Sequence, residues 1–515
     1  SMTDGFLGYP LRWVRDNWKH YVWDCIYAHG CAAVPEMPLP TAAPPRPIQG
    51  QIEAVRTSTS GERFARLVPL TLSAENSFED DEDDAEVTIW LDPSERFQQI
   101  LGFGGSFTES SADLPMSDEQ QKQILDAYFS PECGLGYRMG RLHMNSCDFS
   151  EGNWSCCDTA NDRELSSFSI ARYHESLIPM MEAAQHSAGK PLLLLASPWS
   201  PPAWMKSNGR MCGGGTLKED CKQIWAKFYV RFAQEFMKIG LPLWGFTVQN
   251  EPKATMTWES CIYEHDDERD FVRDHLGPAL EQSGLGLKLI VWDHNRDLMY
   301  ERAKACFDDQ AASRYIWGIG FHWYGDPEVE TWPFWTHRKF LDDCENVQKV
   351  HDSWPSKHII FTEGCQEQGA RIGDWNLGER YGSEIMMQLN AWTEAWIDWN
   401  LILDETGGPN HQNNCCSAPV IYDTRRDVII YQPSYYYIGH FSRHIKPGAQ
   451  RVGCRIGCER AAAVEATAFA NPDGTLVVVV MNTGRRDVSL RLEHAGAVAW
   501  AEAPAHSITT FSLLA

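Results

Sequence analysis

The sequence predicts an α/β fold in which a (β/α)8 TIM barrel carries an associated antiparallel β-sandwich domain formed from both chain ends. In the middle of the chain, short apolar runs alternate with helix-like stretches eight times. Near-continuous apolar strands of this kind are typical of a parallel sheet that is buried on both faces. Strand-like segments of period two lie on either side of this region and are separated by turn signals.

The eight expected barrel strands each end in polar or aromatic residues, and helical patterns such as 218–239 lie between them. The strands cover 98–105, 136–145, 191–197, 243–250, 286–293, 317–324, 357–363 and 394–402. The competing architecture is a doubly wound open sheet. The count of eight and the lack of a GxGxxG motif after the first strand favour the barrel.

The domain organisation follows from changes of pattern along the chain. We expect an N-terminal extension and Pro-rich linker at 1–48, N-terminal sandwich strands at 49–97, the barrel at 98–434 and the C-terminal β-sandwich at 435–515. The acidic run EDDEDD at 79–84 is expected to form a solvated loop. The strands expected at the two ends are 52–56, 87–91, 463–471, 475–482, 487–493 and 507–514.

The composition limits the classes of partner. A formal net charge of −25 argues against nucleic acid, because phosphate recognition needs a basic surface. No run of 18 apolar residues is present, so no transmembrane segment is expected, while peripheral lipid contact is left open. The 21 tryptophans suit a protein that stacks rings on the apolar faces of sugars, although most of them are expected in the core. The oligomeric state is not predicted.

The cysteines and histidines do not predict a metal site or a cofactor. The 16 cysteines are scattered, lack paired zinc-type spacing and are interpreted as buried thiols or a few disulfides. His322, His351 and His358 form no HExxH-like set. No G-x-S-x-G elbow follows a strand, which argues against a serine hydrolase. The expected chemistry therefore uses side chains alone.

Two glutamates stand at the ends of the fourth and seventh expected strands, Glu251 and Glu363. TIM barrels carry their chemistry at the C-terminal ends of strands, and these two strands lie nearly opposite each other. Two facing carboxyl groups are what hydrolysis of a glycosidic bond requires, with short separations giving retention and longer ones inversion. Glu251 is the expected acid/base, with Asn250 beside it for a sugar 2-hydroxyl. Glu363 is the expected nucleophile, whose negative charge would raise the pKa of Glu251.

Each strand-end residue also has a simpler interpretation. An isolated strand-end glutamate is more often an ion-pair partner, and Trp199 and Trp399 either cap the barrel core or form a sugar-stacking wall. Tyr324 is expected to orient the nucleophile. Supporting roles are expected for His322, which could equally be a satisfied histidine, and for Arg141. Asp293 is expected to pair with Arg296, and Glu367 to be solvated.

Several motifs together resemble one known family, from about residue 97 to the C-terminus. They are GFGGSFTES, SCDFS, LLASPWSPPAWMK, TVQNEP, HWY, FTEG, WIDWNLILDETGGPN, QPSYYYIGHFSRHI and DGTLVVVVMN. In order and spacing they resemble the glucosylceramidases, the glucocerebrosidase branch of glycoside hydrolase family 30. The resemblance implies a (β/α)8 barrel with a side β-sandwich built from both chain ends. The N-terminal region and the loop NHQNNCC depart from the family pattern.

The resemblance implies roles for individual residues. It makes Glu251 the acid/base and Glu363 the nucleophile, and it needs no metal or cofactor. The implied substrate contacts are Asp148, Trp199, Asn250, Trp399 and Asn414, to which the strand-end pattern adds Tyr324.

The expected function is that of a retaining exo-β-glucosidase acting on glucosylceramide or related β-glucosides through a covalent glycosyl-enzyme. The alternatives are a β-xylosidase, β-fucosidase or β-1,6-glucanase with the same mechanism, and, in another class, an inactive carbohydrate-binding relative. No secretory signal opens the chain. A secreted or lysosome-like setting follows from the resemblance, and a cytoplasmic one stays open.

Overall fold

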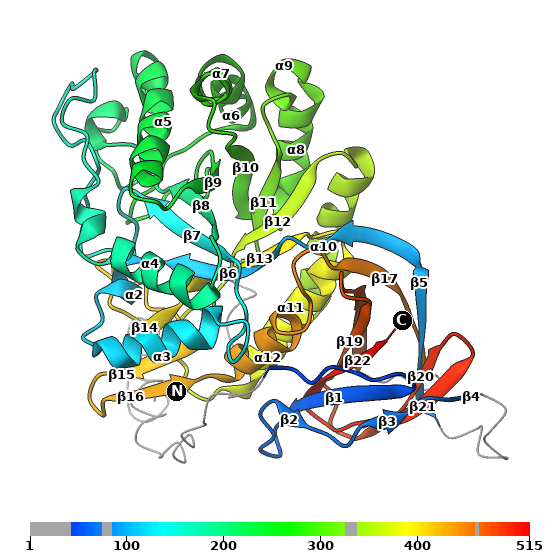
Figure 1. The fold of residues 1–515 in the computed structure, drawn as a ribbon. Coiled ribbons are helices and arrows are strands. Elements are labelled where there is room, and N and C mark those ends of the chain that lie inside the picture. Colours follow the sequence, from blue (N-terminus) through cyan, green and yellow to red (C-terminus); the bar gives the residue numbers. More distant parts are fainter. Residues whose placement is uncertain (1–42, 75–84, 325–336, 459–462, 515) are drawn as a thin grey trace, which may run out of the picture.

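Eight parallel strands close into a barrel in the computed structural model, which describes residues 43–74, 85–324, 337–458 and 463–514. The strands follow one another around the ring in chain order, and the last pairs with the first (Figure 1). They are β6 (Gly102–Phe107), β7 (Met139–Met144), β8 (Leu193–Pro198), β9 (Leu243–Thr247), β10 (Lys288–Asn295), β11 (Gly318–His322), β12 (His358–Glu363) and β13 (Ala395–Asn400). The predicted barrel is confirmed.

The barrel strands are buried on both faces, as their apolar runs predict. Met139, Leu195, Ile290 and Ile360 belong to a small apolar cluster that is separate from the larger cluster between the strands and the helices. These two layers are what a barrel with a filled interior requires. Gly104 explains part of the GFGG pattern, because a Cβ at that position would lie 2.0 Å from the carbonyl oxygen of Met139.

An outer ring of helices covers the barrel (Figure 1). The predicted helix at 218–239 is present as α5, which buries Trp225, Phe228, Phe232 and Phe236 along one face. Such i, i+4 spacing produces the amphipathic stripe that packs on the strands. The α-helices are α2 (Glu109–Ala112), α3 (Asp118–Phe129), α4 (Leu177–Ala188), α5 (Lys222–Lys238), α6 (His265–Phe271), α7 (Gly277–Ser283), α8 (Met299–Asp308), α9 (Gln310–Ser313), α10 (His337–Ser353), α11 (Trp375–Asn390) and α12 (Pro433–Ser442).

Short helical segments complete the ring. The 3₁₀ turns are η3 (Ala171–His174), η4 (Ala203–Met205), η5 (Glu219–Cys221) and η7 (Arg296–Leu298), and η6 (Val272–Leu276) is a π-helical segment between α6 and α7. A small sheet that the sequence pattern did not predict follows the last barrel strand. It consists of β14 (Ile402–Asp404), β15 (Val420–Asp423) and β16 (Val428–Tyr431), and the loop between β14 and β15 carries Asn414.

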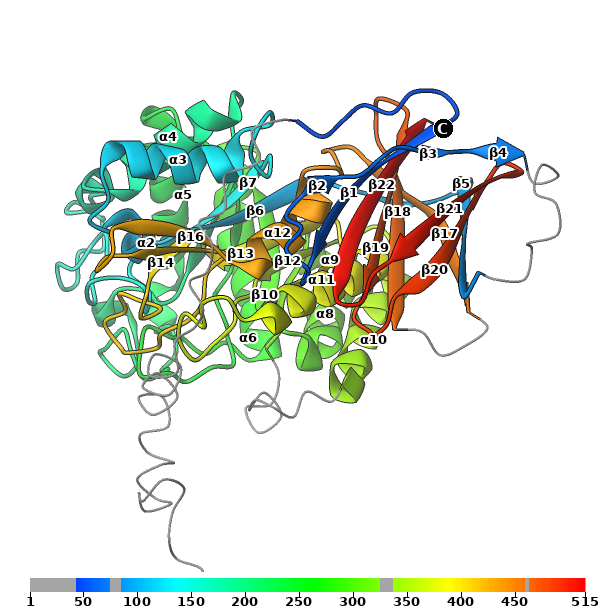
Figure 2. The same ribbon diagram turned by 90° about the horizontal axis from the view of Figure 1, so that it is seen from below.

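The second domain is a large sheet assembled from both chain ends (Figure 2). Its strands are β1 (Gln51–Ser58), β2 (Ala65–Arg66), β3 (Leu70–Thr71), β4 (Ser73–Ala74), β5 (Val87–Gln99), β17 (Gln450–Cys458), β18 (Val464–Ala470), β19 (Thr475–Asn482), β20 (Val488–His494), β21 (Ala497–Ala503) and β22 (Ser507–Leu514). β1 pairs with β22, and β5 lies between β17 and β20. The predicted sharing of one sheet by the two ends is confirmed.

Although the strands form one continuous sheet, Ile52 on β1 and Val87 on β5 lie in the same apolar cluster. Strands so far apart in the order share a core only if the sheet wraps over itself, which makes it a sandwich. One pairing departs from the predicted antiparallel pattern, because β20 and β5 are parallel. Five strands of this sheet were not among those predicted: β17, β21 and the two-residue strands β2, β3 and β4.

Helix α12 joins the barrel to the sandwich. His440 on this helix is fully buried, and its two ring nitrogens lie 2.9 Å from the hydroxyl of Thr510 on β22 and 2.9 Å from that of Thr57 on β1. The expected boundaries at 97/98 and 434/435 fall within β5 and α12. In the structure, the chain enters the barrel after Gln99 and returns to the sandwich after Ser442.

Some of the features that the sequence predicts lie partly or wholly outside the residues that the structure describes. Most of the N-terminal extension and the acidic run at 79–84 lie outside the described residues. The twelve cysteines that the structure describes in full are all free thiols, which supports the interpretation as thiols for that part of the chain. Among the described residues, no helix is long and apolar enough to cross a membrane.

Candidate active site

The C-terminal ends of the barrel strands bring the two glutamates to a common centre. Glu363 is the last residue of β12, and Glu251 follows β9 by four residues. The imidazole Nδ1 of His322 lies 3.3 Å from Oε1 of Glu251 and 3.9 Å from Oε1 of Glu363. The Oε1 atoms of Glu251 and Glu363 are therefore no further apart than the sum of these two distances. Both side chains are largely buried, at 14% and 8% exposed.

The backbone at Glu251 is in the left-handed region, with φ of 48°. A non-glycine residue in this region is strained by roughly 1–3 kcal/mol and persists only where its surroundings hold it. Here the Glu251 N–H donates to the carbonyl of Asp293 at 2.9 Å, and the preceding Asn250 N–H donates to Pro198 at 2.8 Å. The neighbouring strands β8 and β10 thus fix the direction in which Glu251 leaves β9.

Arg141 on β7 is fully buried and links four partners at the strand ends. Its guanidinium donates to Oε2 of Glu363 at 2.5 Å, to Oδ2 of Asp293 at 2.9 Å, to Oδ1 of Asn250 at 2.8 Å and to Oγ of Ser197 at 3.0 Å. The planar fork of arginine suits such multiple contacts. Arg141 therefore fixes the position of Glu363 relative to Asn250, and the structure brings it to the place expected for a supporting residue.

Asp293 lies at the centre of this network, contrary to the expectation that it would pair with Arg296. It accepts hydrogen bonds from His322 Nε2 at 2.8 Å and, besides Arg141, from the hydroxyls of Thr247 and Thr362 at 2.6 Å each. Arg296 pairs with Glu384 on α11, at 2.7 Å.

The prediction was wrong because β10 is irregular at this point. Trp292 and Asp293 both have positive φ, of 74° and 55°, and the register with β11 shifts between Trp292 and His294. A bulge of this kind changes the direction in which side chains point, and a period-two strand pattern does not predict it.

Tyr324 contacts the second oxygen of Glu363. Its hydroxyl donates to Oε1 of Glu363 at 3.1 Å and lies 3.3 Å from the sulfur of Cys365. With Arg141 on the other oxygen, both oxygens of Glu363 have a hydrogen-bond donor. Hydrogen bonds of this kind favour the ionised form of a carboxylate and hold it in one orientation.

Burial and nearby cations set the pKa values of the pair. Burial raises the pKa of Glu363, and the opposing charges of His322 and Arg141 do not cancel this effect. Burial also acts to raise the pKa of Glu251, but the hydrogen bond with His322 and the charges of His294 and His322 outweigh it and lower the pKa. The expectation that the charge of Glu363 raises the pKa of Glu251 is therefore wrong for the site without a sugar, because an imidazolium stands between the two groups.

His322 is the group that carries a proton in this cluster. Burial acts to lower its pKa, but the charge of Glu363 and the hydrogen bonds with Asp293 and Glu251 raise it to about 9. Asp293 is ionised, because the charge of Arg141 and the contact with His322 lower its pKa far below the ordinary value despite burial. His322 is thus more than a satisfied core histidine, since it links the acid/base candidate to a buried carboxylate.

The expected sugar contacts gather around the glutamates. Trp199 and Trp399 stack on each other with ring centroids 5.1 Å apart, and both are nearly fully buried. The guanidinium of Arg141 lies over both rings, at 4.8 and 5.5 Å. The indoles of Trp199 and Trp399 therefore form one stacked pair beside Arg141, the partner of Glu363, rather than two separate surfaces for a sugar.

Asp148 and Asn414 form a second polar group at this end of the barrel. The Asn414 amide donates to Oδ2 of Asp148 at 3.0 Å. Burial raises the pKa of Asp148 to about 8, against the effect of this hydrogen bond. The loop that carries Asn414 departs from the family motif, yet the structure places Asn414 next to Asp148.

Sequence reasoning missed His294 and misjudged Asp293. His294 Nδ1 lies 3.9 Å from Oε1 of Glu251, and it is the residue next to Asp293 on β10. The available signal was the position of the segment WDHN at the end of the fifth barrel strand.

Asp398 has a different role, since it accepts a hydrogen bond from Tyr381 on α11 at 2.8 Å. Glu367 is partly exposed, and its backbone forms an isolated antiparallel bridge with Cys416.

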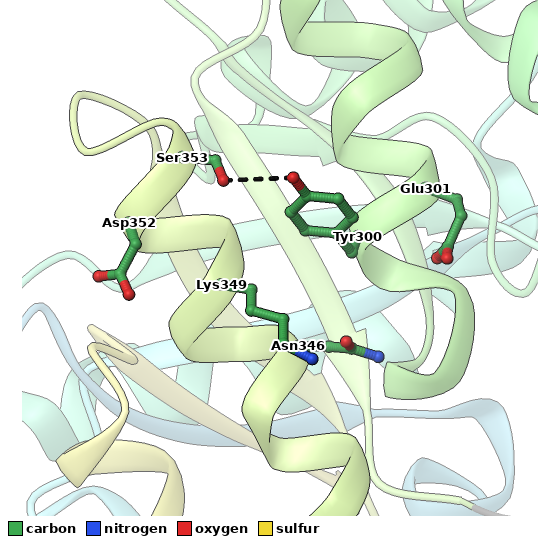
Figure 3. A pocket seen from close by; sticks show the side chains of 6 residues that line it. All are labelled: Tyr300, Glu301, Asn346, Lys349, Asp352 and Ser353. Atoms are coloured by element: carbon green, nitrogen blue, oxygen red, sulfur yellow. Dashed lines mark hydrogen bonds between the residues drawn. The ribbon is translucent and has the colours of Figure 1, made fainter.

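A groove of about 450 Å³ lies elsewhere, between α8 and α10 (Figure 3). No barrel strand contributes a residue to it, and its walls are polar and charged side chains from the two helices. The lining residues are Tyr300, Glu301, Asn346, Lys349, Asp352 and Ser353. It is therefore distinct from the strand-end site that carries the paired glutamates.

Comparisons with known proteins agree with the fold and identify the family. The family model described as the glycosyl hydrolase family 30 TIM-barrel domain matches residues 100–445, and the family 30 beta sandwich domain matches 448–511. The lysosomal acid glucosylceramidase of Mus musculus is 35% identical over 421 residues, covering 78% of this chain and 79% of the relative.

Solved structures show the same relationship. The crystal structure of SrfJ from Salmonella typhimurium matches with a TM-score of 0.81 and 31% identity, covering 90% of this chain and all of that one. An endo-beta1,6-glucanase matches with a TM-score of 0.77 and 26% identity, with the same coverage. Fold, paired carboxylates and relatives together define a glycoside hydrolase built on a TIM barrel. The chain belongs to glycosyl hydrolase family 30, in the glucosylceramidase branch, as its motifs predicted.

Proposed function

We propose that this glycoside hydrolase is a retaining exo-β-glucosidase that hydrolyses glucosylceramide or a related β-glucoside. The observation that carries the proposal is the unequal setting of the two glutamates. Glu363 has a donor on each oxygen, from Arg141 and Tyr324, whereas Glu251 faces the imidazole of His322. A fixed carboxylate suits attack on carbon, and a carboxylate beside a protonated imidazole suits exchange of a proton.

In the first step, an oxygen of Glu363 forms a bond to the anomeric carbon while the glycosidic C–O bond breaks. Glu251 gives its proton to the departing oxygen, so the aglycone leaves as a neutral alcohol. In the second step, Glu251 takes a proton from water, and the water oxygen displaces Glu363 from the same carbon. Two inversions produce glucose with the β-configuration retained, and both glutamates return to their starting states.

The proton that Glu251 needs is present at His322. In the site without substrate, this proton lies on the imidazole, and Glu251 is 3.3 Å away. A bound sugar excludes water from the two carboxylates, and desolvation favours the neutral form of Glu251. We propose that the proton then passes from His322 Nδ1 to Glu251, which delivers it to the leaving oxygen. Asp293 stabilises the imidazole throughout, through its contact with Nε2.

Asn250 is the proposed partner of the sugar 2-hydroxyl. Arg141 donates to its side-chain carbonyl at 2.8 Å, which leaves the amide N–H groups as donors toward the sugar. A hydrogen bond to this hydroxyl strengthens as the oxocarbenium-like transition state forms. Asp148 and Asn414 are the proposed partners of more distant hydroxyls, with Trp199 and Trp399 as the apolar surface beside them.

The choice of glucosylceramide rests on the relatives, since the mouse relative is named a lysosomal acid glucosylceramidase. The second candidate is a β-1,6-glucanase, because the matching endo-beta1,6-glucanase covers 90% of the chain. The related β-xylosidase and β-fucosidase activities use the same mechanism. An inactive sugar-binding protein would not need the donors that hold Glu363.

A substrate panel tests the proposal. Rates are compared for glucosylceramide in detergent micelles, aryl β-glucoside, aryl β-xyloside, aryl β-fucoside and a β-1,6-linked glucan. The proposal expects the highest kcat/KM with glucosylceramide or the aryl glucoside and release of single glucose units. A strong preference for the xyloside or fucoside, or short oligosaccharides released from the glucan, would contradict the glucosidase assignment. No turnover of any substrate would support the sugar-binding alternative.

A further inference from the structure

Three side chains from different barrel strands converge on one point beside Glu363. Glu251, His294 and His322 each offer one ligand atom, and these atoms all lie within 4.8 Å of one another. Oε1 of Glu251 is 3.3 Å from Nδ1 of His322 and 3.9 Å from Nδ1 of His294. Around a tetrahedral Zn²⁺ with bonds of about 2.0–2.2 Å, ligand atoms lie roughly 3.3–3.5 Å apart. Small side-chain rotations would bring the three atoms to this spacing.

His294 has a nitrogen without a partner at the right place. Its Nδ1 is buried and has no hydrogen-bond partner among the described residues. A buried polar atom without a partner costs about 1–3 kcal/mol, so such atoms call for an explanation. A neutral imidazole nitrogen has the lone pair that a cation requires.

The second histidine is held as metal-binding histidines are. Nε2 of His322 lies 2.8 Å from Oδ1 of Asp293, and that carboxylate also accepts from Thr247 and Thr362. A carboxylate on one ring nitrogen fixes the tautomer and directs the other nitrogen to the metal. In this arrangement, Nδ1 of His322 faces Glu251.

We propose that Glu251, His294 and His322 form an inhibitory binding site for a borderline transition-metal cation, with Zn²⁺ as the preferred ion. Two imidazole nitrogens and one carboxylate oxygen are ligands that zinc prefers, and a fourth position is left for water. The binding claim stands on the geometry alone, whereas the claim of inhibition rests on the proposed role of Glu251. A cation on Oε1 of Glu251 and Nδ1 of His322 would prevent both groups from carrying the proton to the leaving oxygen.

Binding is measured on the full chain without substrate, by titration calorimetry with Zn²⁺ and by the visible absorption of added Co²⁺. The proposal expects an absorption spectrum of a four-coordinate Co²⁺ site and saturable binding of one Zn²⁺ per chain. His294→Asn and His322→Asn are each expected to weaken zinc binding by about 10–100-fold. Tyr324→Phe serves as the matched control, since it leaves all three ligands and the charge of Glu363 in place.

Thiolates also bind zinc. Cys416→Ser tests this alternative, because Cys416 lies in the same apolar cluster as Trp399. Its zinc affinity is expected to match that of the wild type. Unchanged affinity in both histidine variants, or loss of affinity in Cys416→Ser, would overturn the proposal. If zinc binds as expected but does not inhibit hydrolysis, the metal site stands and the proposed role of Glu251 fails.

Discussion

The surroundings of Glu251 and Glu363 differ more than their shared residue type suggests. Glu363 is the last residue of β12 and has Arg141 and Tyr324 as donors at 2.5 and 3.1 Å. Glu251 stands on a strained backbone past its strand, and its side chain faces the imidazoles of His322 and His294 at 3.3 and 3.9 Å. The fold thus holds one carboxylate with two donors and places the other beside an imidazole, which is the division of labour that the proposed double displacement requires.

The comparison is tested most strongly at Glu363. Glu363→Gln keeps the shape of the side chain but removes the nucleophile, so kcat is expected to fall by roughly 10⁴-fold or more. Binding of a glucose-like competitive inhibitor, measured by calorimetry, is expected to change little. Glu367→Gln is the matched control and should keep wild-type activity. Turnover near the wild-type level in Glu363→Gln would remove the basis for calling this residue the nucleophile.

Glu251→Ala tests the proposed acid/base role by comparing substrates with good and poor leaving groups. Without the acid/base, kcat/KM is expected to fall by about 10²–10⁴-fold for substrates with poor leaving groups, and much less for an activated aryl glucoside. Azide needs no general base, so it should restore part of the rate and give a β-glucosyl azide. An equal loss for good and poor leaving groups, with no effect of azide, would mean that Glu251 does not handle the proton.

A smaller effect is expected at Tyr324. Tyr324→Phe removes the donor to Oε1 of Glu363 and leaves the ring in place, so kcat is expected to fall by about 10–100-fold with little change in KM. Because the lost hydroxyl stabilised the ionised carboxylate, the acid limb of the pH–rate profile should move to higher pH. If Tyr324 only packed against its neighbours, Tyr324→Phe would lower the melting temperature and leave the acid limb of the pH–rate profile unchanged.

The last expected effect concerns stability rather than rate. His322 and Asp148 both have raised pKa values, of about 9 and about 8, so the folded chain holds these protons more tightly than the unfolded chain. The free energy of unfolding is expected to fall as the pH rises from 6.5 to 9, by about 3 kcal/mol from His322 alone. Thermal unfolding across this range measures it, and His322→Asn should flatten the curve. Stability that increases with pH would contradict the assigned protonation states.

The sequence predicted the parts of the fold that depend on local pattern. All eight barrel strands were located from apolar runs, and Glu251 and Glu363 were found because they end the fourth and seventh of them. The helix at 218–239 was found from its amphipathic spacing, and α5 occupies most of it. Tyr324 and His322 were expected near the glutamates, and the structure places both there.

What the sequence did not predict depends on contacts between distant segments. Asp293 was paired with the wrong arginine because the bulge in β10 changes the direction of its side chain. The parallel pairing of β20 with β5 joins segments that are far apart in the chain. The pKa of Glu251 was predicted in the wrong direction because His322, on another strand, lies between the two glutamates. None of these three effects leaves a periodic signal in the sequence.

Covalent trapping tests the central claim most directly. The full chain is incubated with a cyclitol epoxide that reacts with the nucleophile of retaining β-glucosidases, and the labelled peptide is sequenced by mass spectrometry. The account predicts one label per chain, on the carboxylate of Glu363, and no label in Glu363→Gln. A label on Glu251, or full inactivation without any label on Glu363, would contradict the division of roles between the two glutamates.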